Sequence, residues 1–435
     1  MLNNEVFRAN DISLQVENDI SLVAERSTVP ANFSKTSWSL QETLRCVLPA
    51  SSENFINGRK SYLKFKVSVG DLGGAYNAGF GVGSALNLFR SAWAQPSSGS
   101  EACRVDRLGL HQTSTLPYRA SLDWFKTVGS AVGYGMSSTG AGNVIGDWGV
   151  QQKIPTEEVS EFTIPLSLLM PCFDCEKLLP PTLVSGMTLN WSMEQAAIAM
   201  VFSNDLATTT NVTIESPEIY LDCYRFNDGT TNVLRQVASK DGLFNQFSAW
   251  RHQPLNANTT ALTITSQQQL TNVTGVFLKS RTTASQVLDA DSYASLPNTT
   301  TEATQAPAAG FSGYSLQVGS NVYPKQPVRG DQSLIYRNTI NAYSGDYFHH
   351  PSAVSYNRVT GADNVVAGTW NVGHGLIAID LRKSDSIPDS GLALVNGETL
   401  QCNVDFATAV ASVHDMFICH EQYAMSNAKG VKSLI

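Results

Sequence analysis

The sequence has little charge and no cluster of basic residues. Only 15% of its 435 residues are Asp, Glu, Lys or Arg, and the formal net charge is −8. Proteins that bind nucleic acid through its phosphates usually carry a basic patch, stripe or tail. The charge balance therefore gives no indication of nucleic-acid binding.

Long apolar runs are also missing. No run approaches the roughly 20 residues that a membrane-spanning helix needs. The opening stretch, MLNNEVFRANDISLQVEND, has neither the basic n-region nor the apolar h-region of a signal peptide. We therefore expect a protein without a membrane span that is made inside a cell.

Cysteines are few and odd in number, which argues against a disulfide framework. Cys172 and Cys175 form a CxxC pair in PCFDCEKLLPP, but no second CxxC or suitably spaced histidine pair completes a zinc site. The thioredoxin-like βαβ context of a redox CxxC is absent as well. We expect all seven to be buried structural thiols, with no metal or cofactor: Cys46, Cys103, Cys172, Cys175, Cys223, Cys402 and Cys419.

The prolines around this pair predict its local structure. Pro171 suits the first turn of a helix. Pro180 and Pro181 should end that helix, because the residue before a proline, Leu179, is pushed out of the αR region. Cys172 and Cys175 are therefore expected on one short helical turn between two strands.

Signatures of catalysis are not found either. The glycines at 79, 81 and 83 do not give GxGxxG, and no P-loop Lys-Ser/Thr follows them. PDSG at 388–391 contains the Asp-Ser-Gly motif of aspartic proteases, but the second copy of the motif that such an enzyme needs does not occur. The HExxH and GxSxG motifs are absent as well. The seven histidines are dispersed without the spacing of a ligand set or a triad. We expect no enzymatic activity.

The chain does contain many segments in which apolar and polar residues alternate with a period of two. YLKFKVSV places Leu63, Phe65, Val67 and Val69 on one face, and MTLNWSME does the same at 187–194. WSLQETLRCVL alternates over 38–48. Such segments are typical of half-buried antiparallel strands, so the fold class is all-β. Helices are expected only at 85–94, 119–129 and 332–344.

The two halves of the chain echo each other. EFTIPLSLLMP, VSGMTLNWSME and SPEIYLDCYRF in the first half correspond to HGLIAIDLRKS, VNGETLQCNVDF and VHDMFICHEQYAM in the second. Residues 400, 402, 404 and 406 take the inward parity of residues 187, 189, 191 and 193. We expect two similar β-domains, 1–230 with an N-terminal segment and 231–435, with the boundary near 225–236.

The order of these segments resembles the double jelly-roll major capsid proteins of tailless icosahedral DNA viruses, the adenovirus hexon-like lineage. The resemblance lies in IPLSLL, KLLPPTLVSGMTL, INGRKSYLKFKVSV, GSALNLFRSAWAQPSSG and SGLALVNGETLQCNVDF. It implies two consecutive eight-stranded jelly-roll barrels with short helices in the connections. It also implies a virion protein that forms homotrimeric, pseudo-hexagonal capsomers. Its partners would be itself, neighbouring capsomers, and minor capsid or penton proteins.

An alternative hypothesis is a secreted or surface β-sandwich binding module, such as a lectin or adhesin. Arg329, Gly330 and Asp331 form an RGD tripeptide, a candidate cell-attachment site, although a match of three residues favours an ordinary turn. The lack of a signal peptide and the odd cysteine count weigh against this alternative. Six glycosylation sequons would favour it, at Asn32, Asn190, Asn211, Asn258, Asn272 and Asn298.

Overall fold

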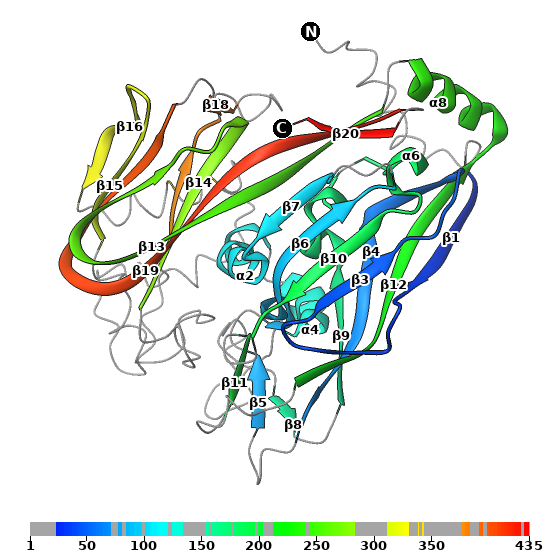
Figure 1. The fold of residues 1–435 in the computed structure, drawn as a ribbon, viewed down its shortest axis with the longest axis horizontal. Coiled ribbons are helices and arrows are strands. Elements are labelled where there is room, and N and C mark those ends of the chain that lie inside the picture. Colours follow the sequence, from blue (N-terminus) through cyan, green and yellow to red (C-terminus); the bar gives the residue numbers. More distant parts are fainter. Residues whose placement is uncertain are drawn as a thin grey trace.

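The structure, a computed structural model, consists of two β-sandwiches side by side (Figure 1). The described residues are 23–434, apart from 71–76, 81–83, 98–100, 121–123, 134–152, 156–158, 176, 196–198, 203–211, 241–242, 283–310, 330–337, 339–341, 343–375, 383–390, 395–397 and 428–429.

The first sandwich is formed by two facing antiparallel sheets. One has the order β1-β12-β4-β9, with β2 paired to β12, and the other has the order β3-β10-β6-β7. Their bounds are β1 Val23–Asn32, β2 Ser37–Ser39, β4 Asn54–Val69, β9 Val159–Pro165 and β12 Val212–Phe226, and then β3 Thr43–Val47, β6 Phe89–Gln95, β7 Cys103–Asp106 and β10 Thr188–Met193. A small sheet of β5 Asn77–Phe80, β8 Lys153–Pro155 and β11 Met200–Phe202 extends from one end (Figure 1).

The predicted alternation builds the core of this sandwich. In β4, Leu63, Phe65 and Val67 are buried while Lys66 is exposed. In β10, Trp191 is fully buried, and its indole nitrogen donates to the carbonyl of Leu169 at 3.2 Å. A buried indole N–H needs such a partner, so this bond fixes the connection after β9 against the core.

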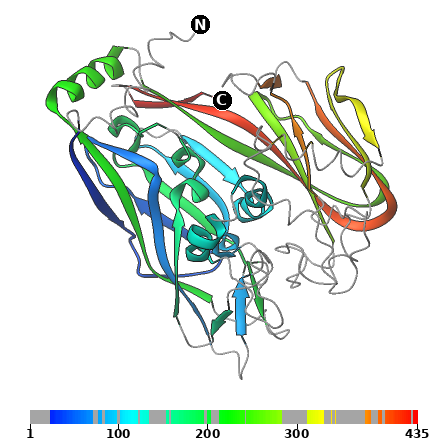
Figure 2. The same cartoon turned by 180° about the vertical axis from the view of Figure 1, so that it is seen from behind.

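The second sandwich depends on one long ribbon. β13 Leu243–Ser266 and β19 Leu400–Asn427 pair antiparallel along almost their whole length. β19 also pairs with β15 Phe311–Val318 near one end, with β14 Leu270–Thr282 in its middle and with β20 Gly430–Leu434 at the other end. The register shifts between Thr259 and Ala261, and there the ribbon bends so that it contributes to both layers (Figures 1 and 2).

Three further strands complete the second sandwich. β16 Asn321–Arg329 pairs with β15, while β17 Leu376–Asp380 and β18 Leu392–Leu394 pair with β14. Leu400, Cys402 and Val404 are buried and Gln401 is half-buried. The predicted inward parity is confirmed for these positions, and the side chain of Phe406 lies outside the described residues.

Helices are short, and the prediction of a helix over 85–94 is confirmed only as far as residue 88. Ser84–Leu88 form a 3-10 helix, η2, and the rest is strand β6, paired with β7 and β10. Local Ala and Leu favour helix, but pairing on both edges overrides that preference. The other helices within the described residues are α2 Leu108–Arg119, the π-helical η3 Phe125–Gly129, α4 Ser130–Val132, α5 Leu166–Leu169, η4 Pro171–Phe173, α6 Pro181–Val184 and α8 Asp228–Lys240.

The remaining two helix predictions have different outcomes. For 119–129, the second half is helical as η3, but α2 comes earlier than expected and ends at Arg119. The segment 332–344 lies outside the described residues apart from positions 338 and 342. No helix within the described ranges is long and apolar enough to cross a membrane.

The matched parity of the two halves can be tested by substitution. Trp191→Asp and Val404→Asp place a carboxylate in the interior of the first and of the second sandwich, where an unpaired buried charge costs several kcal/mol. Each should unfold or aggregate the sandwich that contains it. Thr188→Asp and Gln401→Asp, at half-buried positions of opposite parity in the same two strands, should lower the melting temperature far less. A Val404→Asp protein that melts like the parent would contradict the matched parity of the two halves.

The middle of β19 is buried on both faces and carries two buried histidines. His414 and His420 are 1% and 0% exposed. Burial lowers the pKa of His414 to about 4, although the adjacent Asp415 carboxylate raises it. Burial, assisted by the positive charge of Arg251, lowers the pKa of His420 to about 4. Both imidazoles are therefore neutral in the folded chain at neutral pH.

These depressed pKa values predict a loss of stability in mild acid. The unfolded chain takes up protons on these histidines near pH 6.5 and the folded chain only near pH 4, so stability is complete above 6.5 and falls between 6.5 and 4. Each histidine contributes at most about 3 kcal/mol to this loss. His420→Leu should flatten the fall in melting temperature over this pH range. An unchanged pH dependence in that variant would contradict the assignment.

Candidate functional site: the contact between the two sandwiches

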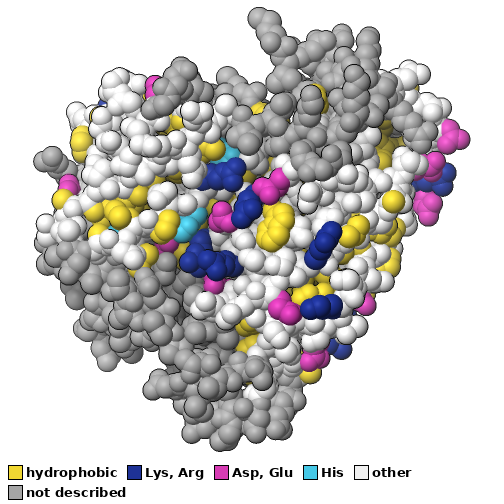
Figure 3. Space-filling model, in the orientation of Figure 1, with side chains coloured by type: hydrophobic (Ala, Val, Ile, Leu, Met, Phe, Trp, Pro, Cys, Tyr) yellow, Lys and Arg dark blue, Asp and Glu magenta, His cyan; other side chains and the backbone are white. Residues whose placement is uncertain are grey.

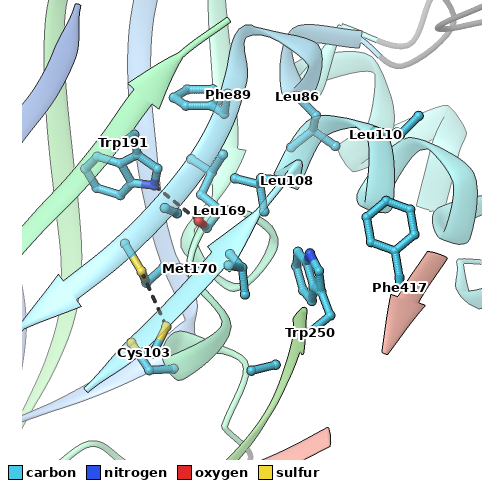
Figure 4. Close-up of a cluster of buried hydrophobic side chains, with 14 of the residues drawn as sticks. Leu86, Phe89, Cys103, Leu108, Leu110, Leu169, Met170, Trp191, Trp250 and Phe417 are labelled. Atoms are coloured by element: carbon cyan, nitrogen blue, oxygen red, sulfur yellow. Dashed lines mark hydrogen bonds between the residues drawn. The ribbon is translucent and has the colours of Figure 1, made fainter. Parts of the chain in front are cut away.

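The two sandwiches meet where the ribbon of β13 and β19 passes β7 and α2. Trp250 of β13 is 5% exposed, and its indole N–H donates to the carbonyl of Asp106 in β7 at 2.9 Å. Phe417 of β19 points toward the same region as Leu108 and Leu110 of α2 (Figure 4). One apolar core thus continues from the first sandwich into the second.

His111 of α2 is the centre of this contact. Its ring stacks on Trp250, with 3.8 Å between ring centroids and 9° between ring planes. Phe417 and Phe277 meet the same ring edge-on, at 5.2 and 6.3 Å between centroids. The imidazole is therefore held by three aromatic rings from three strands: Trp250 of β13 stacks on it, and Phe277 of β14 and Phe417 of β19 lie roughly perpendicular to it.

Charged groups are buried beside these aromatic rings. His252 Nε2 lies 2.8 Å from Asp415 Oδ1, and both side chains are almost fully buried. Lys279 of β14, only 8% exposed, pairs in register with Asp415. Charged side chains gather in the middle of the face in Figure 3, over the line where the sandwiches meet. His252, Asp415 and Lys279 belong to β13, β19 and β14, so these buried charges lie within the second sandwich, and breaking one of the pairs would leave an uncompensated charge there.

A second contact lies at the end of the molecule that carries α8 and β20 (Figure 1). The Asn227 side-chain oxygen accepts from the Thr230 backbone N–H at 2.9 Å and caps α8. Leu234 of this helix packs into a small apolar cluster with residues of the first sandwich. Thr182 Oγ1 of α6 lies 2.9 Å from Ser426 Oγ of β19. The two sandwiches are therefore joined at two separate places.

The cysteine pair belongs to this scaffold. Cys172 and Cys175 are 2% and 5% exposed, and the Asn245 amide of β13 donates to the Cys175 sulfur at 3.8 Å. Burial raises the pKa of the Cys175 thiol, and a neighbouring Cys103 thiol together with burial raises that of Cys172. Thiols held neutral in this way are poor metal ligands and poor nucleophiles. Within the described ranges no cluster of His, Cys, Asp and Glu could hold a metal ion.

The helical turn around this pair is shorter than predicted. The 3-10 helix η4 begins at Pro171 as expected but ends at Phe173, before Cys175. Leu179 is extended and exchanges backbone hydrogen bonds with Ile56, as its position before a proline requires. Pro181 does not end a helix but begins α6, at a position that suits proline equally well. A Cβ on Gly58 would collide with the backbone of Phe173, so η4 lies directly against β4.

The structure tests the RGD prediction only in part. β16 ends at Arg329, whose backbone pairs with Gly313 of β15. Gly330 and Asp331 lie outside the described residues. The cell-attachment tripeptide therefore stays a prediction.

Sequence reasoning missed the role of two histidines in this contact. His111, His252, His414 and His420 are distant in the sequence, and their spacing gave no signal. The tertiary structure brings His111 to Trp250 and His252 to Asp415.

Comparisons with known proteins give a clear result at the level of structure alone. No family model and no curated protein matches the sequence. The structure matches one solved in "The 3.5 A resolution structure of the Sputnik virophage by cryo-EM", with a TM-score of 0.63 and 11% identity over 96% of this chain and 89% of that one. The Faustovirus major capsid protein matches with a TM-score of 0.58 and 8% identity over 98% of this chain and 99% of that one.

A third match concerns a further virus. The PBCV-1 Vp54 structure fitted into the Sputnik reconstruction has a TM-score of 0.60 and 7% identity, and covers 94% of this chain and 96% of that one. All three matches span both sandwiches and the contact between them. The chain therefore has the fold of the double jelly-roll major capsid proteins of viruses.

Proposed function

We propose that this chain is the major capsid subunit of an icosahedral virus and assembles through homotrimeric, pseudo-hexagonal capsomers. The observation that carries the proposal is the agreement in fold over 96% of the chain with a structure from the Sputnik virophage. Its location would be the virion, and its partners would be further copies, neighbouring capsomers, and minor capsid or penton proteins. The proposal involves no enzymatic step.

The contact between the sandwiches supports this role physically. A trimer of a chain with two similar sandwiches presents six similar units around one axis, which a hexagonal lattice can accommodate. Closed cyclic symmetry buries the contact surfaces without open-ended growth. The six units keep a fixed outline only if the two sandwiches of each chain do not move apart. The Trp250–His111 stack and the hydrogen bond from Trp250 to Asp106 provide that constraint.

We place the boundary between the two domains near residue 230. α8 begins at Asp228, directly after the last strand of the first sandwich, β12, and directly before β13. The proposed domains are thus 1–230 and 231–435. Leu234 lies against Phe55 and Phe226 of the first sandwich, so α8 serves as a packed connection rather than as a loose linker.

Solution mass provides the first test of the proposal. Light scattering of the purified chain should give three times its 47.0 kDa mass, or a larger assembly. Negative-stain microscopy should then show hexagonal blocks or shells. A monomer that persists at high concentration across pH and salt would favour the alternative, a secreted or surface β-sandwich binding module of the lectin or adhesin type.

Substitution of Trp250 tests whether the contact between the sandwiches supports assembly. Trp250→Ala removes the stack on His111 and the hydrogen bond to Asp106, and should lower the free energy of unfolding by about 3–5 kcal/mol. The yield of trimers should fall with it. Trp93→Ala, a half-buried tryptophan of β6, is the matched control and should cost much less stability. Equal melting temperatures for the two variants would contradict this role of Trp250.

A further inference from the structure

Cys419 differs from the other six cysteines of the chain. Those six are buried, whereas Cys419 is partly exposed. It lies in β19 with Trp250 opposite on β13 and Gly275 opposite on β14. Gly275 has no side chain, and the Phe277 ring of β14 lies 3.5 Å from the place where its Cβ would stand.

An imidazole stands next to this thiol. His111 Nε2 lies 3.8 Å from Cys419 Sγ, within hydrogen-bond reach for sulfur. The ring cannot turn away easily, because Trp250 stacks on its face and Phe417 and Phe277 meet it edge-on. A fixed imidazole beside a thiol is the arrangement that converts a cysteine into a nucleophile.

Both groups line a pocket of about 180 Å³ between the two sandwiches. The pocket also presents the carboxylates of Asp174 and Glu421 and the guanidinium of Arg382. Arg59 pairs with the Asp174 carboxylate at 3.1 Å, and Asp380 engages the Arg382 guanidinium at 3.0 Å. These three carboxylates and two guanidiniums have a formal charge of −1 together, which favours a small ligand that carries positive charge.

We propose that Cys419 and His111 form a reactive-thiol site for small disulfides that bear ammonium groups. His111 Nε2 takes the proton of the thiol, and the Cys419 thiolate attacks one sulfur of the disulfide. The bond from Sγ to that sulfur forms as the disulfide bond of the ligand breaks, and the departing thiolate takes the proton. The exchange needs no other oxidant, because the disulfide ligand is itself reduced. The product is a mixed disulfide in the pocket between the sandwiches.

This site does not depend on the proposed capsid function, and it can be tested on the purified full-length chain. The protein is incubated with cystamine, with dithiodiglycolate or with the neutral hydroxyethyl disulfide, and each cysteine is followed by peptide mass mapping. Cys419 should be the first of the seven to be modified. Cystamine should react faster than dithiodiglycolate. Cys419→Ser should abolish this first modification.

Two variants separate reactivity from simple exposure. His111→Phe keeps a ring stacked on Trp250 but removes the base, and the rate at neutral pH should fall by at least about tenfold. Its rate should then rise with pH up to the range where an ordinary thiol ionises, about pH 8.5. Glu421→Gln should reduce the preference for cystamine over dithiodiglycolate.

Three results would overturn the proposal. One is first modification at a cysteine other than Cys419, and another is an equal rate in the parent and His111→Phe proteins with the same pH dependence. The third is a cystamine preference that Glu421→Gln leaves intact. If His111→Phe fails to fold, as its melting curve would reveal, the Glu421→Gln comparison decides alone.

Discussion

The burial of one ribbon on both of its faces is the constraint on which the rest of the structure depends. β13 and β19 pair over almost their whole length, and residues 413–418 of β19 are all buried. A strand of this kind cannot face water on either side, so it needs a core above and a core below. The second sandwich supplies one of them, and α2 with β7 of the first sandwich supplies the other.

The same constraint explains why polar groups lie so deep in the molecule. Asp415 and His414 are adjacent in β19 and point to opposite faces, so no rotation of the strand could expose both. Inside the protein, each side chain must therefore either have a partner or be uncharged. Asp415 lies 2.8 Å from His252, while burial keeps His414 neutral. The second sandwich, to which β19 belongs, thereby becomes sensitive to acid.

A fixed joint is what the proposed function requires. Identical subunits that pack into a shell must all have the same shape, and motion between the two sandwiches of a subunit would change that shape. Here the joint combines a tryptophan hydrogen bond, an aromatic stack and a capped helix at the far end. It also encloses the pocket that contains Cys419. Chemistry at that thiol would therefore act on the part of the chain that sets the angle between its two sandwiches.

The sequence by itself determined the fold class and the inward parity of both halves. It also predicted seven buried cysteines, which is right for six and wrong for Cys419, which is partly exposed. These features depend on the period of two along each strand and on residue type, which any short window displays. The order of the segments also carried the resemblance to double jelly-roll capsid proteins. Leu63, Trp191 and Val404 are buried as their local pattern predicted.

Only the tertiary structure decided what happens between segments far apart in the chain. Residues 89–95 became a strand because β7 and β10 pair with both edges, and no local pattern contains that information. His111 and Cys419, 308 residues apart, meet because a helix of one sandwich packs on a strand of the other. Contacts of this kind depend on the whole fold, since the free energy that brings them together comes from the burial of the surrounding core rather than from the residues themselves.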